Sequence, residues 1–117
     1  MATPNIVNVT TINGTSVQQP NVSTSAQTLV TCASNHVYKI NTIYVANRTA
    51  GNISITCQVI RSSSTTYLAY QMVVPGNSSL VIIGKDSPIY LNEADYVQVL
   101  ASAANSLDVI LSYDDIS

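Results

Sequence analysis

The sequence has little charge, and the charge that it has is dispersed. Only 9% of its 117 residues are charged, against about 25% in an average soluble domain. Its cations are Lys39, Arg48, Arg61 and Lys85, which lie far apart along the chain. A nucleic-acid-binding protein needs several clustered cations that displace counterions from phosphates. The sequence therefore argues against a nucleic-acid partner.

Long apolar runs are missing as well. No apolar stretch approaches the roughly 20 residues that a membrane-spanning helix needs. Residues 1–25 also lack the basic start and apolar run of a secretory signal. We therefore expect no membrane partner, and a protein that is made and kept in a cytoplasm or assembled there into something larger.

The chain contains one histidine and two cysteines. A structural zinc site takes four ligands, and there is no CxxC motif, so we expect no metal and no cofactor. Cys32 and Cys57 both fall in expected strands. Without a secretion signal, two buried thiols are the simpler interpretation. A disulfide stays open, because the sequence does not fix the distance between them.

Convergent catalytic groups are also lacking. His36 has no nucleophile at a supporting spacing, and a turn histidine bonded to its own backbone is the simpler interpretation. Glu93 and Asp95 share a turn, where carboxylates usually cap the backbone. Two carboxylates could perform glycoside hydrolysis, but the chain has no Trp or Phe to build a sugar platform. We expect a protein that is not an enzyme and has no catalytic residue.

What the chain has instead is a neutral polar surface and tyrosine. Hydrophobic residues make up 46% of the chain, and seven of them are tyrosines. A surface built from hydroxyls and amides is weakly protected against association, and tyrosine suits half-buried surfaces. This composition favours a protein that is packed against neighbours over a sticky soluble monomer.

Alternating apolar and polar residues predict an all-β chain. The expected strands cover residues 26–33, 36–46, 53–59, 67–74, 79–84, 88–91, 95–101 and 107–114. No segment shows a helical period, so we expect an antiparallel β-sandwich, jelly-roll-like, of about eight short strands in one domain over residues 26–117.

Four local features are expected within this sandwich. The apolar phase slips near Asn41–Thr42, which predicts a bulge. Gly51 is expected to supply a positive φ in its turn. Residues 62–66 are read as a loop. The nearly continuous apolar run 79–84 is read as a strand that is covered on both faces.

Residues 1–25 differ from the rest in their abundance of Thr, Asn, Ser and Gln. Asn13–Gly14 suits a two-residue hairpin turn, so this segment is expected to be a loose hairpin or an extended arm. A segment with too few apolar residues for its own core often orders only against a partner, and a frayed terminus is equally compatible.

Several stretches carry a resemblance to a known family. They are VYKINTIYVAN (37–47), GNISITCQV (51–59) with the Ser/Thr-rich segment after it, YLAYQMVVPGNSSLVIIGKDSPIYLNEAD (67–95) and LDVILSYDDIS (107–117). Together they resemble small virion structural proteins of tailed bacteriophages, especially phages that infect cyanobacteria. The pattern covers roughly residues 30–117 and includes no catalytic motif.

The resemblance implies a non-enzymatic β-sandwich component of a virion that is assembled in the host bacterial cytoplasm. The favoured role is that of a capsid decoration, or cement, protein that binds over junctions between major capsid protein subunits and stabilises the head. Such a protein is expected to be a homo-oligomer, with a trimer favoured. The alternatives are a neck, tail or baseplate subunit that contacts another virion protein, and a carbohydrate-binding β-sandwich module.

Two segments are the candidates for partner contact. The first is the apolar part of the arm, Ile6, Val7, Val9 and Ile12. The second is the hydroxyl run Ser62, Ser63, Ser64, Thr65 and Thr66, as an exposed tip.

Overall fold

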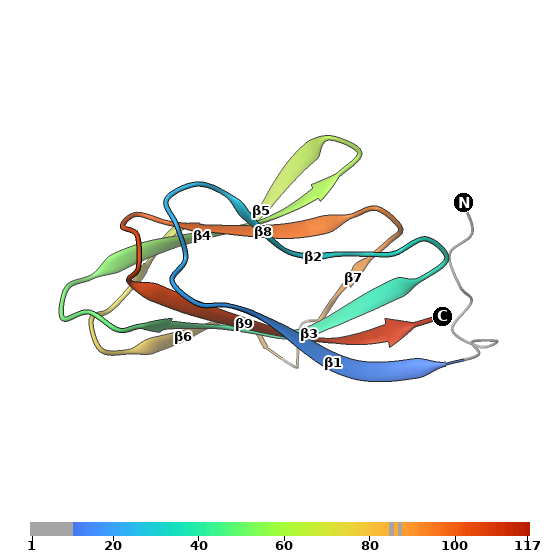
Figure 1. The fold of residues 1–117 in the computed structure, drawn as a ribbon, viewed down its shortest axis with the longest axis horizontal. Coiled ribbons are helices and arrows are strands. Elements are labelled where there is room, and N and C mark those ends of the chain that lie inside the picture. Colours follow the sequence, from blue (N-terminus) through green and yellow to red (C-terminus); the bar gives the residue numbers. More distant parts are fainter. Residues whose placement is uncertain (1–10, 85, 87) are drawn as a thin grey trace.

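The computed structural model describes residues 11–84, 86 and 88–117, and the regular structure in them is entirely β-strand (Figure 1). The strands are β1 (Ile12–Gln19), β2 (Gln27–Thr31), β3 (Val37–Asn47), β4 (Ile53–Arg61), β5 (Ser64–Val74), β6 (Ser79–Ile83), β7 (Ile89–Leu91), β8 (Tyr96–Ala101) and β9 (Leu107–Ile116). The predicted all-β class is confirmed. The described residues contain no helix that could cross a membrane.

The strands form two antiparallel sheets that face each other as layers (Figure 1). Sheet A has the order β1-β9-β3-β6, and β7 also pairs with β3. Sheet B has the order β2-β8-β4-β5. The chain crosses repeatedly from one sheet to the other, as in a jelly roll. The edges of the two sheets are therefore β1 and β6 with β7 in sheet A, and β2 and β5 in sheet B.

The core lies between the two inner faces. Ile55 and Cys57 from β4 face Leu107, Val109 and Leu111 from β9 across it, and all five side chains are buried. Burying a large apolar side chain stabilises the fold by roughly 1.5–3 kcal/mol. The strict alternation of these strands is therefore what selects their inward faces.

The predicted bulge in β3 is present. The pairing of β3 with β9 shifts by one residue between Ile40 and Thr42. Because of this shift, Ile40 and Ile43 both lie fully buried in the core, although residues three apart face opposite sides of a regular strand.

The glycine expected to adopt a positive φ does not do so. Gly51 has a negative φ, while Asn77 adopts φ 55° in the neighbouring turn. The glycine that the structure requires is Gly76, because a Cβ there would lie 2.1 Å from the carbonyl oxygen of Ala50. The two turns that join the sheets at this end are therefore in direct backbone contact.

The expectation for residues 79–84 is wrong in one respect. Strand β6 is an edge strand of sheet A, and its residues alternate between exposed and covered instead of being covered on both faces. Val81 is 47% exposed. One face of an apolar strand is thus left open.

The expected hairpin at Asn13–Gly14 is also wrong. Both residues lie inside β1 and pair with Asp115 and Asp114 of β9. Strand β1 is a polar edge strand, and its pairing with the far end of the chain overrides the local turn propensity of Asn-Gly. Residues 1–10 of the expected arm lie outside the described residues.

The expected loop over residues 62–66 is shorter than the sequence suggested. Only Ser62 (φ 50°) and Ser63 (φ 66°) form the turn, and Ser64, Thr65 and Thr66 already pair with β4. Positive φ at both central residues defines a type I′ hairpin turn, which favours Asn-Gly over serine.

Candidate binding surfaces

Three exposed apolar side chains form a row across the outer face of sheet A. Tyr44 of β3 lies between Val81 of β6 and Ile110 of β9, each its direct cross-strand partner. Their exposed fractions are 46%, 47% and 40%. We call these three residues the apolar row. Nearly half of each side chain stays uncovered in the monomer, so the row has apolar surface left to contact a partner.

A shallow groove of about 250 Å³ runs beside the apolar row. Gln18 of β1 extends the row beyond Ile110, and Pro20 and Ala46 complete the apolar part of the groove. The groove thus continues the apolar surface from β3 to the edge strand β1.

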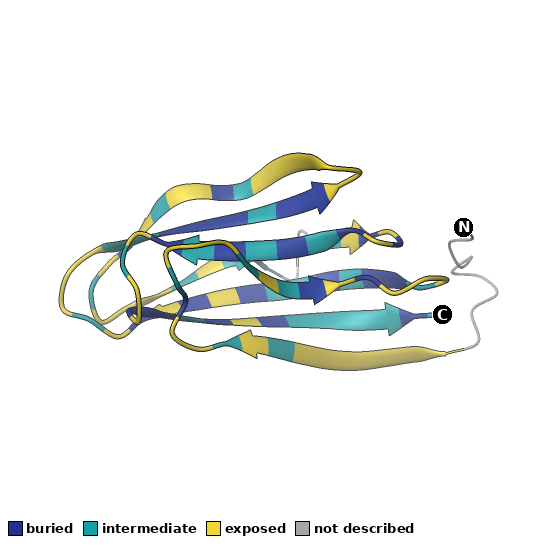
Figure 2. Cartoon of the chain, turned by 45° about the horizontal axis from the view of Figure 1, so that its top comes forward, coloured by how far each residue is buried: buried dark blue, intermediate teal, exposed yellow. Residues whose placement is uncertain are grey.

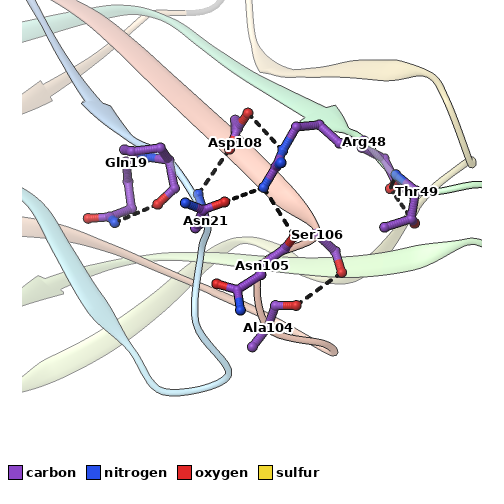
Figure 3. A network of polar contacts seen from close by, with 10 residues as sticks. Gln19, Asn21, Arg48, Thr49, Ala104, Asn105, Ser106 and Asp108 are labelled. Atoms are coloured by element: carbon purple, nitrogen blue, oxygen red, sulfur yellow. Dashed lines mark hydrogen bonds and ion pairs between the residues drawn. The ribbon is translucent and has the colours of Figure 1, made fainter.

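One residue of the groove lining, Asp108, forms an ion pair with Arg48 (Figure 3). The Arg48 Nε lies 3.1 Å from Asp108 Oδ2. Arg48 also donates to the carbonyl oxygen of Asn105 at 3.1 Å and to the side chain of Asn21, whose own backbone N–H donates to Asp108 at 2.9 Å. These contacts tie three connections together and neutralise both charges. This end of the outer face of sheet A therefore presents almost no net charge to a partner.

The outer face of sheet B carries a row of a different kind. Gln58 of β4 donates through Nε2 to Gln98 Oε1 at 2.9 Å, and Gln98 donates through Nε2 to Thr28 Oγ1 at 3.4 Å. Gln58, Gln98 and Thr28 are cross-strand partners. We call them the amide row. Its side chains bond to each other along the surface, so this face is polar without being charged.

Two tyrosines stand beside the amide row on the edge strand β5. Tyr67 is the cross-strand partner of Gln58. Its ring packs edge-to-face against that of Tyr70, with centroids 4.7 Å apart and an interplanar angle of 68°. The two side chains are 51% and 61% exposed.

The edge strands β1 and β5 are largely exposed (Figure 2). Natural sheets usually guard such edges with charged side chains, lysine above all, or with proline. The sequences of β1 (INGTSVQQ) and β5 (STTYLAYQMVV) contain none of these. Neither edge is therefore guarded by charge or proline, and only the register shifts of β5 interrupt its pairing.

The titratable groups at the other end of the molecule serve the fold. Asp95 accepts from the backbone N–H of Asn92 at 2.9 Å and pairs with Arg61 Nε at 2.7 Å. Glu93 accepts from the backbone N–H of Asn35 at 2.9 Å. Asp95 thus caps its own turn, as expected from the sequence, whereas Glu93 caps a turn that is distant in the chain.

The expectation for His36 is wrong. Its Nδ1 lies 2.5 Å from Asp115 Oδ1 near the end of β9, so it bonds a distant side chain instead of its own backbone. Among the described residues, no group of three or more His, Cys, Asp or Glu side chains is placed to hold a metal ion.

The two cysteines are buried free thiols. Burial raises the pKa of Cys57 to about 12. Burial likewise raises the pKa of Cys32 to about 11, against the opposing effect of a hydrogen bond with the Tyr38 backbone. The Cys32 Sγ lies 3.3 Å from the carbonyl oxygen of His36 and 3.5 Å from that of Leu91. With these raised pKa values both thiols are protonated at neutral pH. Since the thiolate is the reactive form, both cysteines are unreactive in the folded chain.

The described parts of the two segments expected to contact a partner belong to different sheets. Ile12 is 57% exposed at the start of β1, on an edge of sheet A. The run from Ser62 to Thr66 forms the β4–β5 hairpin at an edge of sheet B. Ile6, Val7 and Val9 lie outside the described residues.

Sequence reasoning missed the apolar row. A signal for it exists in three uninterrupted apolar triplets, Ile43-Tyr44-Val45, Leu80-Val81-Ile82 and Val109-Ile110-Leu111. In a strand, the middle residue of such a triplet faces away from the core. The sequence does not show that the three middle residues share one row, because that depends on the pairing register.

Comparisons with known proteins place the fold. No protein-family model and no curated protein matches the chain. One similar solved structure is that of Bacillus endospore appendages, described as a novel family of disulfide-linked pili. It is 15% identical with a TM-score of 0.55, and the match covers 100% of this chain and 96% of that chain.

A second similar structure comes from the Gx strain of infectious bursal disease virus. It is 9% identical with a TM-score of 0.47, and the match covers 90% of this chain and 32% of that chain. At such identities a similarity concerns the fold alone.

Proposed function

We propose that this chain is a non-enzymatic structural subunit of a virus particle. The apolar row on the open outer face of sheet A is the observation that carries this proposal. More specifically, we propose that the chain is a capsid decoration protein of the tailed-phage type. It would act in the virion, where the apolar row would contact the major capsid protein.

The chemistry of this face supports a protein partner. Interface cores are depleted of charge and enriched in tyrosine, and the apolar row combines Tyr44 with two aliphatic side chains. The nearest charges, Arg48 and Asp108, neutralise each other. A partner surface can therefore cover the groove without leaving an unpaired charge buried.

The strength of a single contact points to multivalent assembly. Covering the exposed parts of three large apolar side chains contributes on the order of 3 kcal/mol, which alone corresponds to an affinity weaker than about 1 mM. Many such contacts made together on a lattice give firm attachment. This favours a homo-oligomer, a trimer in the first instance, over a single copy.

The open edges of β1 and β5 offer a second means of contact. An extended segment of a neighbour can add to such an edge through main-chain hydrogen bonds. Ile12, exposed at the start of β1, would lie in a contact of this kind. The hairpin from Ser62 to Thr66 would lie at the end of a contact along β5.

Assembly of this chain would not use disulfides. The similar appendage subunits are described as disulfide-linked, but Cys32 and Cys57 are both buried. Neither thiol can reach another subunit while the sandwich stays folded. Any assembly must therefore be held by non-covalent surfaces such as the apolar row.

Co-sedimentation and light scattering with expanded capsids of a cyanobacterial tailed phage test this proposal. The chain should bind at a fixed number per major capsid subunit. Val81→Lys, which places a charge in the apolar row, should lower binding at least about 100-fold. The matched control Thr28→Lys adds the same charge to an exposed strand of the opposite face and should bind normally.

Other results would change the assignment. A ring-sized oligomer that ignores capsids but still requires Val81 would favour the neck, tail or baseplate alternative. A monomer that binds no capsid, with or without Val81→Lys, would contradict the structural role.

A further inference from the structure

Strand β5 departs from regular pairing twice. Tyr67 pairs with Gln58 and Ala69 pairs with Cys57, so one residue, Leu68, is extra. A second extra residue lies before Met72, which pairs with Ile55. In a regular strand, Tyr67 and Tyr70 would point to opposite faces because they are three residues apart. The extra residue Leu68 brings them to the same outer face, and the second bulge follows directly after Ala69.

The second bulge contains a strained residue. Gln71 has φ 50°, a conformation that costs an ordinary side chain on the order of 1 kcal/mol. Its backbone N–H donates to Thr56 Oγ1 at 3.1 Å, which holds this conformation in place. Bulges commonly re-aim side chains at sites, and strained residues cluster at binding sites.

The re-aimed tyrosines lie next to an unused acceptor. Gln58 donates through its Nε2 to the amide row, and its Oε1 has no donor among the described residues. Tyr67 is directly opposite on the neighbouring strand, where cross-strand Cβ atoms lie about 5 Å apart. An aromatic ring and a free amide oxygen are thus side by side.

We propose that this outer face of sheet B binds a neutral oligosaccharide. A sugar ring has an apolar C–H face and a rim of hydroxyl groups. The ring faces of Tyr67 and Tyr70 match the apolar part, and the amides of Gln58 and Gln98 both donate and accept, as sugar hydroxyls require. The chain has no Trp or Phe to stack against a sugar, and the tyrosine pair can supply the aromatic surface in their place.

The charge pattern selects the class of sugar. The amide row contains no charged residue, and neither do the adjacent cross-strand pair Thr56 and Leu100 and Tyr70, which packs against Tyr67. An acidic or sulfated sugar would find no cation here to pair with. The ligand class is therefore a neutral glycan.

A groove of mixed polar and apolar lining extends the platform. It holds about 300 Å³ and is lined by Ser54, Thr56, Gln71, Leu100, Ala101 and Ser102. It runs from Gln71 on β5 across β4 to the end of β8. A chain of several sugar units could therefore follow the face from the tyrosine pair across sheet B.

This binding face is separate from the apolar row that the proposed function uses. The two rows belong to different sheets. A sugar on sheet B leaves sheet A free to contact a particle, so either proposal can fail alone.

Saturation-transfer-difference NMR with maltoheptaose, cellohexaose and chitohexaose, followed by titration calorimetry, tests the sugar site. At least one of these probes should bind with a Kd on the order of 1 mM or tighter. Tyr67→Ala and Tyr70→Ala should each weaken that binding roughly tenfold. Tyr44→Ala removes an equally exposed tyrosine from sheet A and should leave it unchanged.

Three results would overturn the sugar site. The first is no saturation transfer to any of the three probes at about 10 mM, well above the expected Kd. The second is equal loss of binding in Tyr44→Ala. The third is a change of oligomeric state in Tyr67→Ala without any sugar response, which would make the tyrosine pair a protein contact.

Discussion

The two outer faces of this sandwich occupy equivalent places in the fold and differ in chemistry. On sheet A, the central row is Val81, Tyr44 and Ile110, and no hydrogen bond joins these side chains. On sheet B, the central row is Tyr67, Gln58, Gln98 and Thr28, with hydrogen bonds that join three of the four. Neither row contains a charged residue.

This difference indicates that the two faces do different work. An apolar row leaves its contact energy for a partner that excludes water. A bonded amide row keeps its side chains in fixed positions and exchanges hydrogen bonds with a polar ligand at little cost. The same inner core supports both, since alternation lets a strand vary its outer residues without disturbing the inner ones.

Exchanging the two chemistries should have the largest effect. The double variant Tyr44→Gln with Ile110→Gln gives sheet A a polar row, and it should weaken particle association about 100-fold. Because each side chain is still more than half covered in the monomer, the free energy of unfolding should fall by roughly 1–3 kcal/mol. Capsid co-sedimentation and urea unfolding measure the two quantities.

The reverse exchange is the matching control. Gln58→Ile with Gln98→Val gives sheet B an apolar row and should create concentration-dependent self-association, seen by sedimentation velocity. If Gln58→Ile with Gln98→Val produces no self-association, and Tyr44→Gln with Ile110→Gln keeps full capsid binding, the chemistry of the outer faces does not decide the contact.

The next largest effect, on stability, is expected where the β5–β6 turn at Gly76 contacts the β3–β4 turn at Ala50. Gly76→Ala should destabilise the fold by about 3 kcal/mol, because its Cβ would overlap backbone atoms of Ala50, which cannot move aside cheaply. Gly51→Ala has nothing within 4 Å of the added Cβ and should change stability by less than about 0.5 kcal/mol. Equal urea midpoints for the two variants would show that the close contact is absent.

A smaller difference is expected between the two cysteines beneath the faces. Cys57→Ser puts a hydroxyl into a fully apolar site and should cost about 2 kcal/mol. Cys32→Ser should cost less than about 1 kcal/mol, because the carbonyl oxygens of His36 and Leu91 can accept from the new hydroxyl. Thermal unfolding of both variants checks this order, and a reversed order would contradict the assigned environments.

The smallest effect is at the hairpin that ends sheet B. Ser62→Asn with Ser63→Gly supplies the residues that a type I′ turn favours and should stabilise the fold by roughly 1 kcal/mol. Ser64→Gly, one position beyond the turn in β5, should instead destabilise it by roughly 0.5–1 kcal/mol. A stabilising effect of both changes in urea unfolding would place the turn elsewhere.

The sequence predicts much of the fold because alternation is local. It identifies eight of the strands and the bulge at Ile40–Thr42, where two inward residues are three apart. It misses β1, because this polar strand lacks alternation and is ordered by pairing with β9 at the other end of the chain. It also misplaces the turn, since Asn13–Gly14 is a strong local signal that long-range pairing overrides.

The candidate surfaces are less predictable, and the reason is physical. The apolar row joins residues 44, 81 and 110, which meet only through the register of three strands. The tyrosine pair depends on the extra residue Leu68 in β5, which no local pattern indicates. A one-residue change of register would move each of these side chains to the other face.

Hydroxyl-radical footprinting of the assembled and monomeric chain, read by mass spectrometry, tests the central claim most directly. Tyr44 and Tyr67 are similarly exposed in the monomer and belong to the two different faces. We predict that assembly on a particle protects Tyr44 strongly and leaves Tyr67 and Tyr70 as reactive as before. Protection of the sheet B tyrosines with Tyr44 still reactive would contradict the assignment of the apolar row as the contact surface.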